Sequence, residues 1–283
     1  GSGNTTAPTG DQGFSLVGNI NTAPSSATYV GNDWFLTAWH VKQLDNPTQV
    51  TLNGNSYTID GSSWTRLNDG VNNADAVMFK VTSSVSEANA TLYTGSHFIG
   101  DDVTMIGNGY DRESSQTTWY VDESTDPDTW NTSPGGHNRT ETGYVWDKSG
   151  TSKRWGTNEI TDSAYINTGY GITHTLYTTF DDNGDPNEAQ GATFDSGGGV
   201  FYNDGGVWSL TGMMVTIGGP TDGQYARAGN VNLPDEAVFG NTTFFADLRQ
   251  YNDQIAAIIA VPELSSLALA GILLGVIWGF RKK

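Results

Sequence analysis

Apolar positions in this chain occur in short runs that are broken by turn-forming residues. The clearest runs, rich in β-branched and aromatic residues, are Ala27–Val30, Trp34–Thr37, Ala76–Val81, Thr173–Phe180 and Val207–Ile217. Runs of this length and composition are typical of β-strands, whereas helices need longer stretches with a period of about 3.6 residues. The pattern therefore predicts an all-β protein with short strands joined by turns.

Weaker runs add further strands to this outline. Asn53-Gly54 separates two of them and favours a hairpin, because this dipeptide tolerates the positive φ of a tight turn. Residues 110–158 have weak periodicity and are expected to form the entry to a second sheet, with long surface loops. The other strands are expected at Phe14–Val17, Val50–Leu52, Tyr57–Ile59, Val103–Ile106, Ile160–Ile166 and Val200–Tyr202.

Helical periodicity appears only towards the end of the β pattern. It predicts a closing helix over Ala246–Ile259, and Pro262 separates this helix from the segment that follows. The apolar positions with helical spacing are Phe245, Leu248, Tyr251, Ile255 and Ile258.

The stretch Leu264–Phe280 is apolar except for two serines and three glycines. As a helix it would span ~26 Å, just short of a ~30 Å hydrocarbon core. Arg281-Lys282-Lys283 follow at once, as expected for the cytoplasmic flank of a membrane segment. This flank and the apolar character all round favour a membrane segment at residues 264–280 over a buried core helix.

Composition narrows the classes of partner. The formal net charge is −18, which disfavours nucleic acid and anionic lipid surfaces as partners. The chain contains no cysteine, so disulfide bonds cannot staple the fold. The first residues, Gly1 to Thr6, are polar and lack the features of a signal peptide, which suggests that a leader has been removed.

Three motifs carry candidate chemistry. Asp195-Ser196-Gly197 opens a glycine-rich turn, in which a serine has little cover and neighbouring N–H groups point towards one spot, as an acyl-transfer nucleophile requires. Upstream, His40 ends the run Trp34 to His40, and Asp75 opens the apolar run that continues to Val81. The three residues occur in the order His, Asp, Ser. Other histidines, at positions 97, 137 and 174, have no such context and are expected to be structural.

Taken together, these motifs resemble those of the trypsin-like (chymotrypsin-fold) serine peptidases, over roughly residues 11–260. The motifs of that family read Leu-Thr-Ala-Ala-His, Asp-Ile-Ala-Leu-Leu and Gly-Asp-Ser-Gly-Gly. The resemblance implies two six-stranded antiparallel β-barrels of the chymotrypsin type with a C-terminal helix, followed by a single hydrophobic tail helix. On this basis residues 1–12 are a leader segment and residues 13–110 are the first barrel. Residues 111–260 are the second barrel with the closing helix, and residues 261–283 are a membrane or sorting segment.

The resemblance also implies roles for individual residues. Ser196 is expected to be the nucleophile, His40 the general base and Asp75 the residue that orients the imidazole. The oxyanion hole is expected to use the backbone N–H groups of Phe194 and Ser196, with Phe194 where the family has glycine.

Two further positions follow from the same alignment of motifs. Gln190 occupies the position at the base of the primary specificity pocket, and its uncharged side chain does not favour a strict preference for Lys or Arg. Asp195 matches the residue that binds the new amino terminus after activation cleavage, which here would lie near Gly1.

The C-terminal layout of Pro262-Glu263, apolar stretch and basic cluster resembles the PEP-CTERM sorting signal of bacteria that possess an exosortase. The signature of that signal is Pro-Glu-Pro, and here Leu264 follows the glutamate. The resemblance implies an extracytoplasmic bacterial protein, anchored by its C-terminus or released at the surface, with an exosortase-type processing enzyme as a partner. A plain membrane anchor is the alternative.

The motifs therefore predict an exported serine endopeptidase that hydrolyses peptide bonds through an acyl-enzyme, with a protein or peptide as substrate. A peptidase-like surface-binding domain of weak or no activity and an esterase with the same triad are the alternatives. No cofactor is expected. The acidic segment Asp181–Glu188 offers oxygen ligands for a structural Ca²⁺, with a solvated acidic turn as the alternative.

Overall fold

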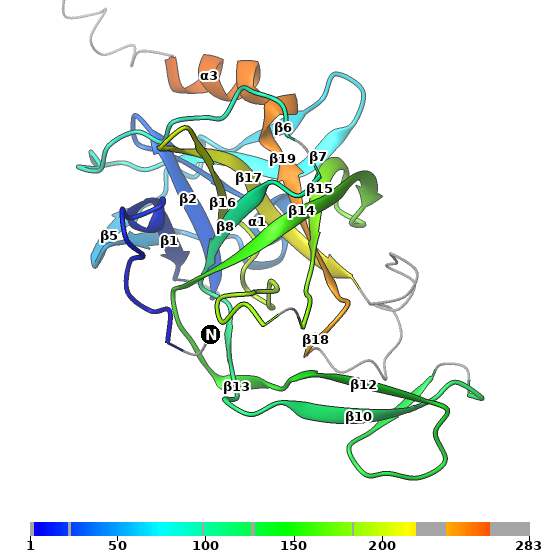
Figure 1. Ribbon diagram of the computed structural model, residues 1–283. Coiled ribbons are helices and arrows are strands. Elements are labelled where there is room, and N and C mark those ends of the chain that lie inside the picture. Colours follow the sequence, from blue (N-terminus) through cyan, green and yellow to red (C-terminus); the bar gives the residue numbers. More distant parts are fainter. Residues whose placement is uncertain are drawn as a thin grey trace, which may run out of the picture.

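The computed structural model describes residues 3–21, 24–97, 99–125, 128–182, 184–218 and 236–260. Figure 1 shows two β units packed together, an arm of further strands below them and a helix on top. The prediction of an all-β protein is confirmed, because strands form both units and the arm.

The first unit is a sheet of seven strands. Its strands are β1 (Val17–Ile20), β2 (Ser25–Gly31), β3 (Trp34–Thr37), β4 (Gln49–Leu52), β5 (Asn55–Thr58), β6 (Thr65–Asn68) and β7 (Asn73–Lys80). They are arranged antiparallel in the order β5-β4-β1-β2-β3-β7-β6. Hydrogen bonds from Asp60 N to Lys80 O (2.9 Å) and from Thr82 N to Thr58 O (2.9 Å) join the continuation of β5 to the end of β7. They curl the sheet, which has seven strands where six were expected.

The second unit is a closed barrel of six strands, as predicted. Its strands are β8 (Asp102–Gly107), β14 (Arg154–Asn167), β15 (Ile172–Thr179), β16 (Gly199–Asp204), β17 (Val207–Gly218) and β19 (Thr242–Asp247). Their order is β14-β15-β19-β17-β16-β8. The expectation that Val103–Ile106 completes the first barrel is wrong, because β8 pairs with β14 and β16. The change from the first unit to the second therefore falls between β7 and β8.

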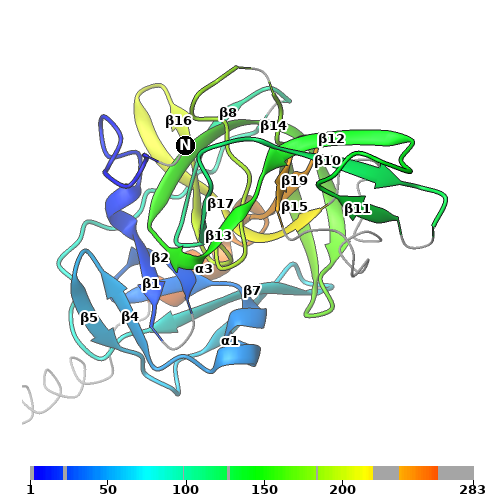
Figure 2. The ribbon, with the colours of Figure 1, turned by 90° about the horizontal axis from the view of Figure 1, so that it is seen from below.

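An arm of paired strands occupies much of the region expected to be loops. It contains β9 (Tyr110–Arg112), β10 (Thr117–Asp122), β11 (Thr129–Asn131), β12 (Arg139–Tyr144), β13 (Trp146–Thr151) and β18 (Ala237–Val238). At its base β9 pairs with β13, and further out the order is β11-β10-β12-β18. Figures 1 and 2 both show β10 and β12 side by side and extending away from the barrels.

Short helices complete the fold. They are the 3-10 helices η1 (Phe14–Leu16) and η2 (Leu248–Gln250) and the α-helices α1 (Trp39–Asp45) and α3 (Asn252–Ala260). The strand expected at Phe14–Val17 is thus mainly the helix η1. Figure 2 shows α1 close to β7. His40, the last residue of the run that begins at Trp34, belongs to this helix.

The closing helix begins later than its periodicity predicts. Residues Thr242–Asp247 are all buried and form β19, which pairs with β15 and β17. A helix that began at Ala246 would take Ala246 and Asp247 out of this strand, where they pair with β15 and β17. The apolar spacing from Phe245 onwards is therefore shared by a strand, η2 and α3, and Ile255 of α3 packs into the main core.

The helices of the described residues include none long and apolar enough to cross a membrane. The expected membrane and sorting segment at residues 264–280 lies outside the described residues.

Candidate active site

His40 and Asp75 are brought together by the pairing of β3 with β7. The chain leaves β3 at Thr37 and turns into α1, which places His40 in the first turn of this helix. The carboxylate of Asp75 then accepts two hydrogen bonds from His40. Its Oδ1 accepts the backbone N–H (2.8 Å), and its Oδ2 lies 2.8 Å from the ring Nδ1. This geometry fixes both the position and the orientation of the imidazole ring.

Asp75 is fully buried, whereas 18% of the His40 side chain is exposed. Burial opposes ionisation of Asp75, but hydrogen bonds from His40 and from the Thr168 hydroxyl hold its pKa below the usual value. The backbone N–H of Asp75 is satisfied as well, since it donates to Thr173 Oγ1 (2.8 Å). The aspartate is therefore a fixed, charged acceptor for the histidine.

The turn between β14 and β15 supplies the residues around this pair that the motifs did not indicate. Thr168 lines the same cleft as His40, and the ring of Tyr170 lies 5.6 Å from the His40 ring. Arg66 on β6 holds the turn, because its guanidinium donates both to Ala74 O (2.9 Å) and to Tyr170 O. Nothing in the local sequence of this turn indicates that it lies against Asp75.

Ser196 lies in a tight turn just before β16. Gly197 has a φ of 90°, and a Cβ at this position would collide with Ser26 O and Thr37 Oγ1. Only glycine fits there, which explains the glycine directly after the serine. The cleft of about 410 Å³ that Ser196 lines is also lined by His40 and Asp75. The Ser196 hydroxyl donates to Val215 O at 3.4 Å, and among the hydrogen bonds of the described residues none joins it to His40.

Backbone hydrogen bonds around Ser196 orient the two peptide planes that contain the N–H groups of Phe194 and Ser196. Thr193 O accepts from Tyr110 N (3.1 Å), and Asp195 O accepts from Gly198 N (2.8 Å). In a trans peptide the C=O and the following N–H point in opposite directions. The N–H groups of Phe194 and Ser196 therefore point away from these partners, and within the described part of the chain neither has an acceptor.

Part of the cleft wall consists of uncharged residues, and the carboxylates of the lining are Asp45, Asp75 and Asp195. The uncharged part includes Gly191, Ala192, Val215, Thr216 and Ile217. Gln190, which was expected at the base of the specificity pocket, does not line this cleft. Its amide instead donates to Gly191 O (3.2 Å) and Glu236 O (3.4 Å), and the residue lines a neighbouring cavity of about 100 Å³.

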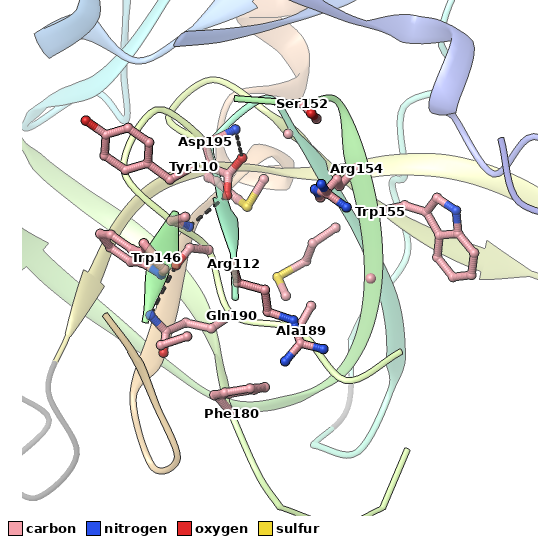
Figure 3. A pocket seen from close by; sticks show the side chains of 18 of the residues that line it. Tyr110, Arg112, Trp146, Ser152, Arg154, Trp155, Phe180, Ala189, Gln190 and Asp195 are labelled. Atoms are coloured by element: carbon pink, nitrogen blue, oxygen red, sulfur yellow. Dashed lines mark hydrogen bonds between the residues drawn. The ribbon is translucent and has the colours of Figure 1, made fainter. Parts of the chain in front are cut away.

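Figure 3 shows this second cavity, with Asp195 at one end between Tyr110 and Arg154. The Asp195 carboxylate accepts from Gly109 N (2.7 Å) and Ala192 N (2.7 Å). Removal from water dominates over these bonds and raises the pKa of Asp195 to about 6. Gly1, the expected partner of Asp195, lies outside the described residues, so this pairing stays a prediction. Asn4 and Thr6, which follow Gly1 closely in the sequence, hydrogen-bond to Trp155, a residue that lines the cavity.

The histidines that were expected to be structural, and the acidic segment considered for Ca²⁺, do not line the cleft. His97 is buried between Asp101 and Thr211, and His174 lies 3.3 Å from Asp247. No cluster of metal-ligating side chains is present among the described residues, and the proposed Ca²⁺ ligand Asp185 accepts bonds from Thr157 and Asn187.

Solved structures share this arrangement of two β units. Human heparin binding protein matches 89% of this chain and 94% of its own length, with a TM-score of 0.51 and 11% identity. A mutant of the same human protein matches with a TM-score of 0.52 and 13% identity, over the same shares. The chain has the chymotrypsin fold.

A chymotrypsin-fold structure of the Rv3671c protease of M. tuberculosis, in an inactive form, matches with a TM-score of 0.49 and 13% identity. It covers 90% of this chain and 94% of its own. No protein-family model and no curated protein matches this chain. At such low identity, the likeness to solved structures shows the fold alone.

Proposed function

We propose that this protein is a serine endopeptidase that hydrolyses peptide bonds through an acyl-enzyme. The observation that carries this proposal is the two-point hydrogen bonding of His40 to buried Asp75, in a cleft that also contains Ser196. Such bonding fixes the tautomer with the proton on Nδ1 and leaves Nε2 free to accept a proton.

In the proposed reaction Ser196 Oγ attacks the scissile carbonyl carbon. A rotation about the Cα–Cβ bond of Ser196 exchanges its long bond to Val215 O for one to His40 Nε2, which takes the hydroxyl proton. His40 then gives this proton to the leaving amine, and the acyl group remains on Ser196. Water, deprotonated by His40, attacks the ester and releases the acid and the free serine.

The developing oxyanion would be stabilised by the N–H groups of Phe194 and Ser196. Both belong to residues that line the cleft, and both lack a partner within the described chain. Donors that are already oriented supply much of the rate enhancement in such reactions, about 10²–10³ for each.

The cleft favours substrates with uncharged side chains. Gly191, Ala192, Val215, Thr216 and Ile217 give the wall an uncharged part, and Leu44 and Tyr170 add apolar side chains that are 65% and 36% exposed. Desolvating a charged side chain against these uncharged residues costs free energy that they cannot offset with an ion pair. A neutral residue at the cleaved bond is therefore expected.

A surface-binding domain without activity is the second candidate, and Phe194 is the observation that favours it. Phe194 has a φ of 79°, a conformation that glycine adopts readily and other residues rarely. If this strain were relieved by a rotation of the preceding peptide, one oxyanion donor would be lost. The heparin binding named for the human neighbour does not suit this chain, because a net charge of −18 repels a polyanion.

The location outside the cytoplasm is part of the proposal and depends on the apolar stretch at residues 264–280. Its likeness to the PEP-CTERM signal makes an envelope anchor, and processing by an exosortase-type enzyme, the expected use of this segment. Membrane fractionation of the chain with and without residues 262–283 tests the anchor.

Labelling with a fluorescent fluorophosphonate tests the catalytic proposal. Wild-type protein is compared with Ser196→Ala and His40→Ala, and each is also given a library of peptides with neutral, basic and acidic residues. Labelling and peptide cleavage that need both residues support the endopeptidase. Folded wild-type protein that is neither labelled nor active favours the binding domain, and ester turnover without peptide turnover favours the esterase.

A further inference from the structure

Phe194 is held in a strained conformation at the point where the proposed mechanism needs an accurate donor. Its φ of 79° lies in the left-handed region, where the Cβ of an ordinary residue crowds the backbone. Such a conformation persists only where the surroundings fix it. The contacts of Phe194 show what fixes it.

The carbonyl of Phe194 is fixed from the first β unit. Ser26 on β2 is fully buried, and its hydroxyl donates to Phe194 O at 3.2 Å. The same hydroxyl accepts from the backbone N–H of Asn108 at 2.9 Å, so its proton is directed towards Phe194. The backbone N–H of Ser26 donates to Ser196 O (3.0 Å), which ties the nucleophile to the same strand.

The other side of Phe194 is fixed from the base of the arm. The backbone N–H of Tyr110 donates to Thr193 O at 3.1 Å and so sets the peptide plane that contains the Phe194 N–H. The ring of Tyr110 packs edge-on against the Phe194 ring, with a centroid distance of 4.9 Å and an interplanar angle of 67°. Phe194 is thus held at its carbonyl, at its preceding peptide and at its ring.

We propose that Ser26 and Tyr110 are positioning residues of the proposed peptidase, which hold Phe194 in a glycine-like conformation and keep its N–H directed at the oxyanion. This inference rests on the proposed function. It explains how phenylalanine can serve at a position that favours glycine. It also makes the oxyanion hole dependent on two separate elements, β2 and β9.

Kinetics of Ser26→Ala, Phe194→Gly and the double variant test the proposal. Ser26→Ala is expected to lower kcat by about 10²-fold with little change in KM, because the donor acts on the transition state. Phe194→Gly provides the reference background, since glycine adopts this φ without support. In the Phe194→Gly background, Ser26→Ala should lower kcat by less than about fivefold, because glycine no longer depends on the serine. Tyr110→Ala should behave like Ser26→Ala, and Tyr110→Phe, which keeps the ring, should behave like wild type.

Ser209→Ala is the matched control, because Ser209 is a buried serine on β17 outside the cleft. Its kcat should stay at the wild-type value. A kcat of Ser26→Ala within threefold of wild type would overturn the proposal. So would a loss that persists in full beside Phe194→Gly, since Ser26 would then have a structural role unrelated to Phe194.

The urea midpoints of wild type, Ser26→Ala, Phe194→Gly and the double variant give a readout that needs no activity. If Ser26 holds Phe194 in place, the effects of Ser26→Ala and Phe194→Gly on the midpoint should not add. Additive effects would contradict the proposal even in an active protein. Non-additive midpoints in a protein that is inactive towards all substrates would refute the endopeptidase but keep the coupling of Ser26 to Phe194.

Discussion

Asp75→Asn tests the link between the histidine and the aspartate most sharply. In the wild type each carboxylate oxygen accepts one N–H of His40, the backbone N–H at 2.8 Å and the ring Nδ1–H at 2.8 Å. An asparagine has one oxygen and one NH₂ group in their place. The backbone N–H can only donate, so it keeps the oxygen, and the NH₂ group then faces Nδ1.

The consequence is a change of tautomer in His40. Nδ1 must accept from the new NH₂ group, so the ring proton moves to Nε2, which can then no longer take the proton of Ser196. The wrong tautomer in the same arrangement costs about 10⁴ in kcat. This corresponds to ~5.4 kcal/mol at ~1.36 kcal/mol per tenfold change.

The assay is kcat and KM of wild type and Asp75→Asn on the best neutral peptide, with circular dichroism as the check on folding. Asp102→Asn is the control, because Asp102 is an exposed aspartate at the start of β8, outside the cleft. A folded Asp75→Asn protein that loses less than tenfold in kcat would contradict this prediction. Asp75 would then not set the protonation of His40.

Three further predictions follow from contacts of the site and of the second barrel. Gly197→Ala should abolish activity and lower the melting temperature, because the new Cβ collides with Ser26 O and Thr37 Oγ1. Gly206→Ala is the control, since Gly206 has a φ of 99° but open space around its Cα, and it should lower the melting temperature only through backbone strain. Thr168→Val should lower kcat about tenfold, because the hydrogen bond to charged Asp75 is lost. The same loss raises the pKa of Asp75, so the acid limb of the kcat–pH profile should move to higher pH. Asp247 is buried, yet the nearby His174 ring and hydrogen bonds from Arg249 hold its pKa well below the usual range. Its contribution to stability is therefore present above the unfolded pKa of ~4 and is lost as pH falls towards the folded value. The unfolding free energy should therefore decrease below pH ~4, and less steeply in Asp247→Asn.

Each of these predictions can fail clearly. Equal losses in Gly197→Ala and Gly206→Ala would show that the collision is absent. An unchanged acid limb in Thr168→Val would mean that the hydroxyl does not act on Asp75. Equal slopes below pH ~4 for wild type and Asp247→Asn would assign acid sensitivity to other groups. Asp195 acts in a different pH window, because its raised pKa of about 6 makes its contribution to stability decrease as pH rises from ~4 to ~6.

The local patterns predicted much of the sheet structure. The run Trp34–Thr37 is β3 as expected, and Asn53-Gly54 forms the turn between β4 and β5 with φ values of 49° and 81°. These features depend on residues that are neighbours in the sequence. The three motifs around His40, Asp75 and Ser196 were found for the same reason, since each is a short local pattern.

Features that depend on distant pairing could not be read from the sequence. The short apolar run of β8 does not distinguish between the two units, and only its pairing with β14 and β16 assigns it to the second barrel. The residues that bond Asp75 and Phe194 are similarly remote. Thr173 is 98 residues from Asp75, and Ser26 is 168 residues from Phe194. The sequence around Thr173 or Ser26 does not indicate these hydrogen bonds, because the neighbours of both residues are ordinary strand residues.

Covalent labelling of Ser196 tests whether this serine is a nucleophile activated by His40. The purified protein is treated with a fluorophosphonate, and fragment mass spectrometry locates the adduct. We expect one equivalent on Ser196, at a rate that falls at least about 10²-fold in His40→Ala, because the serine needs its base. Folded protein that stays unmodified, or an adduct that forms at the same rate without His40, would contradict the account.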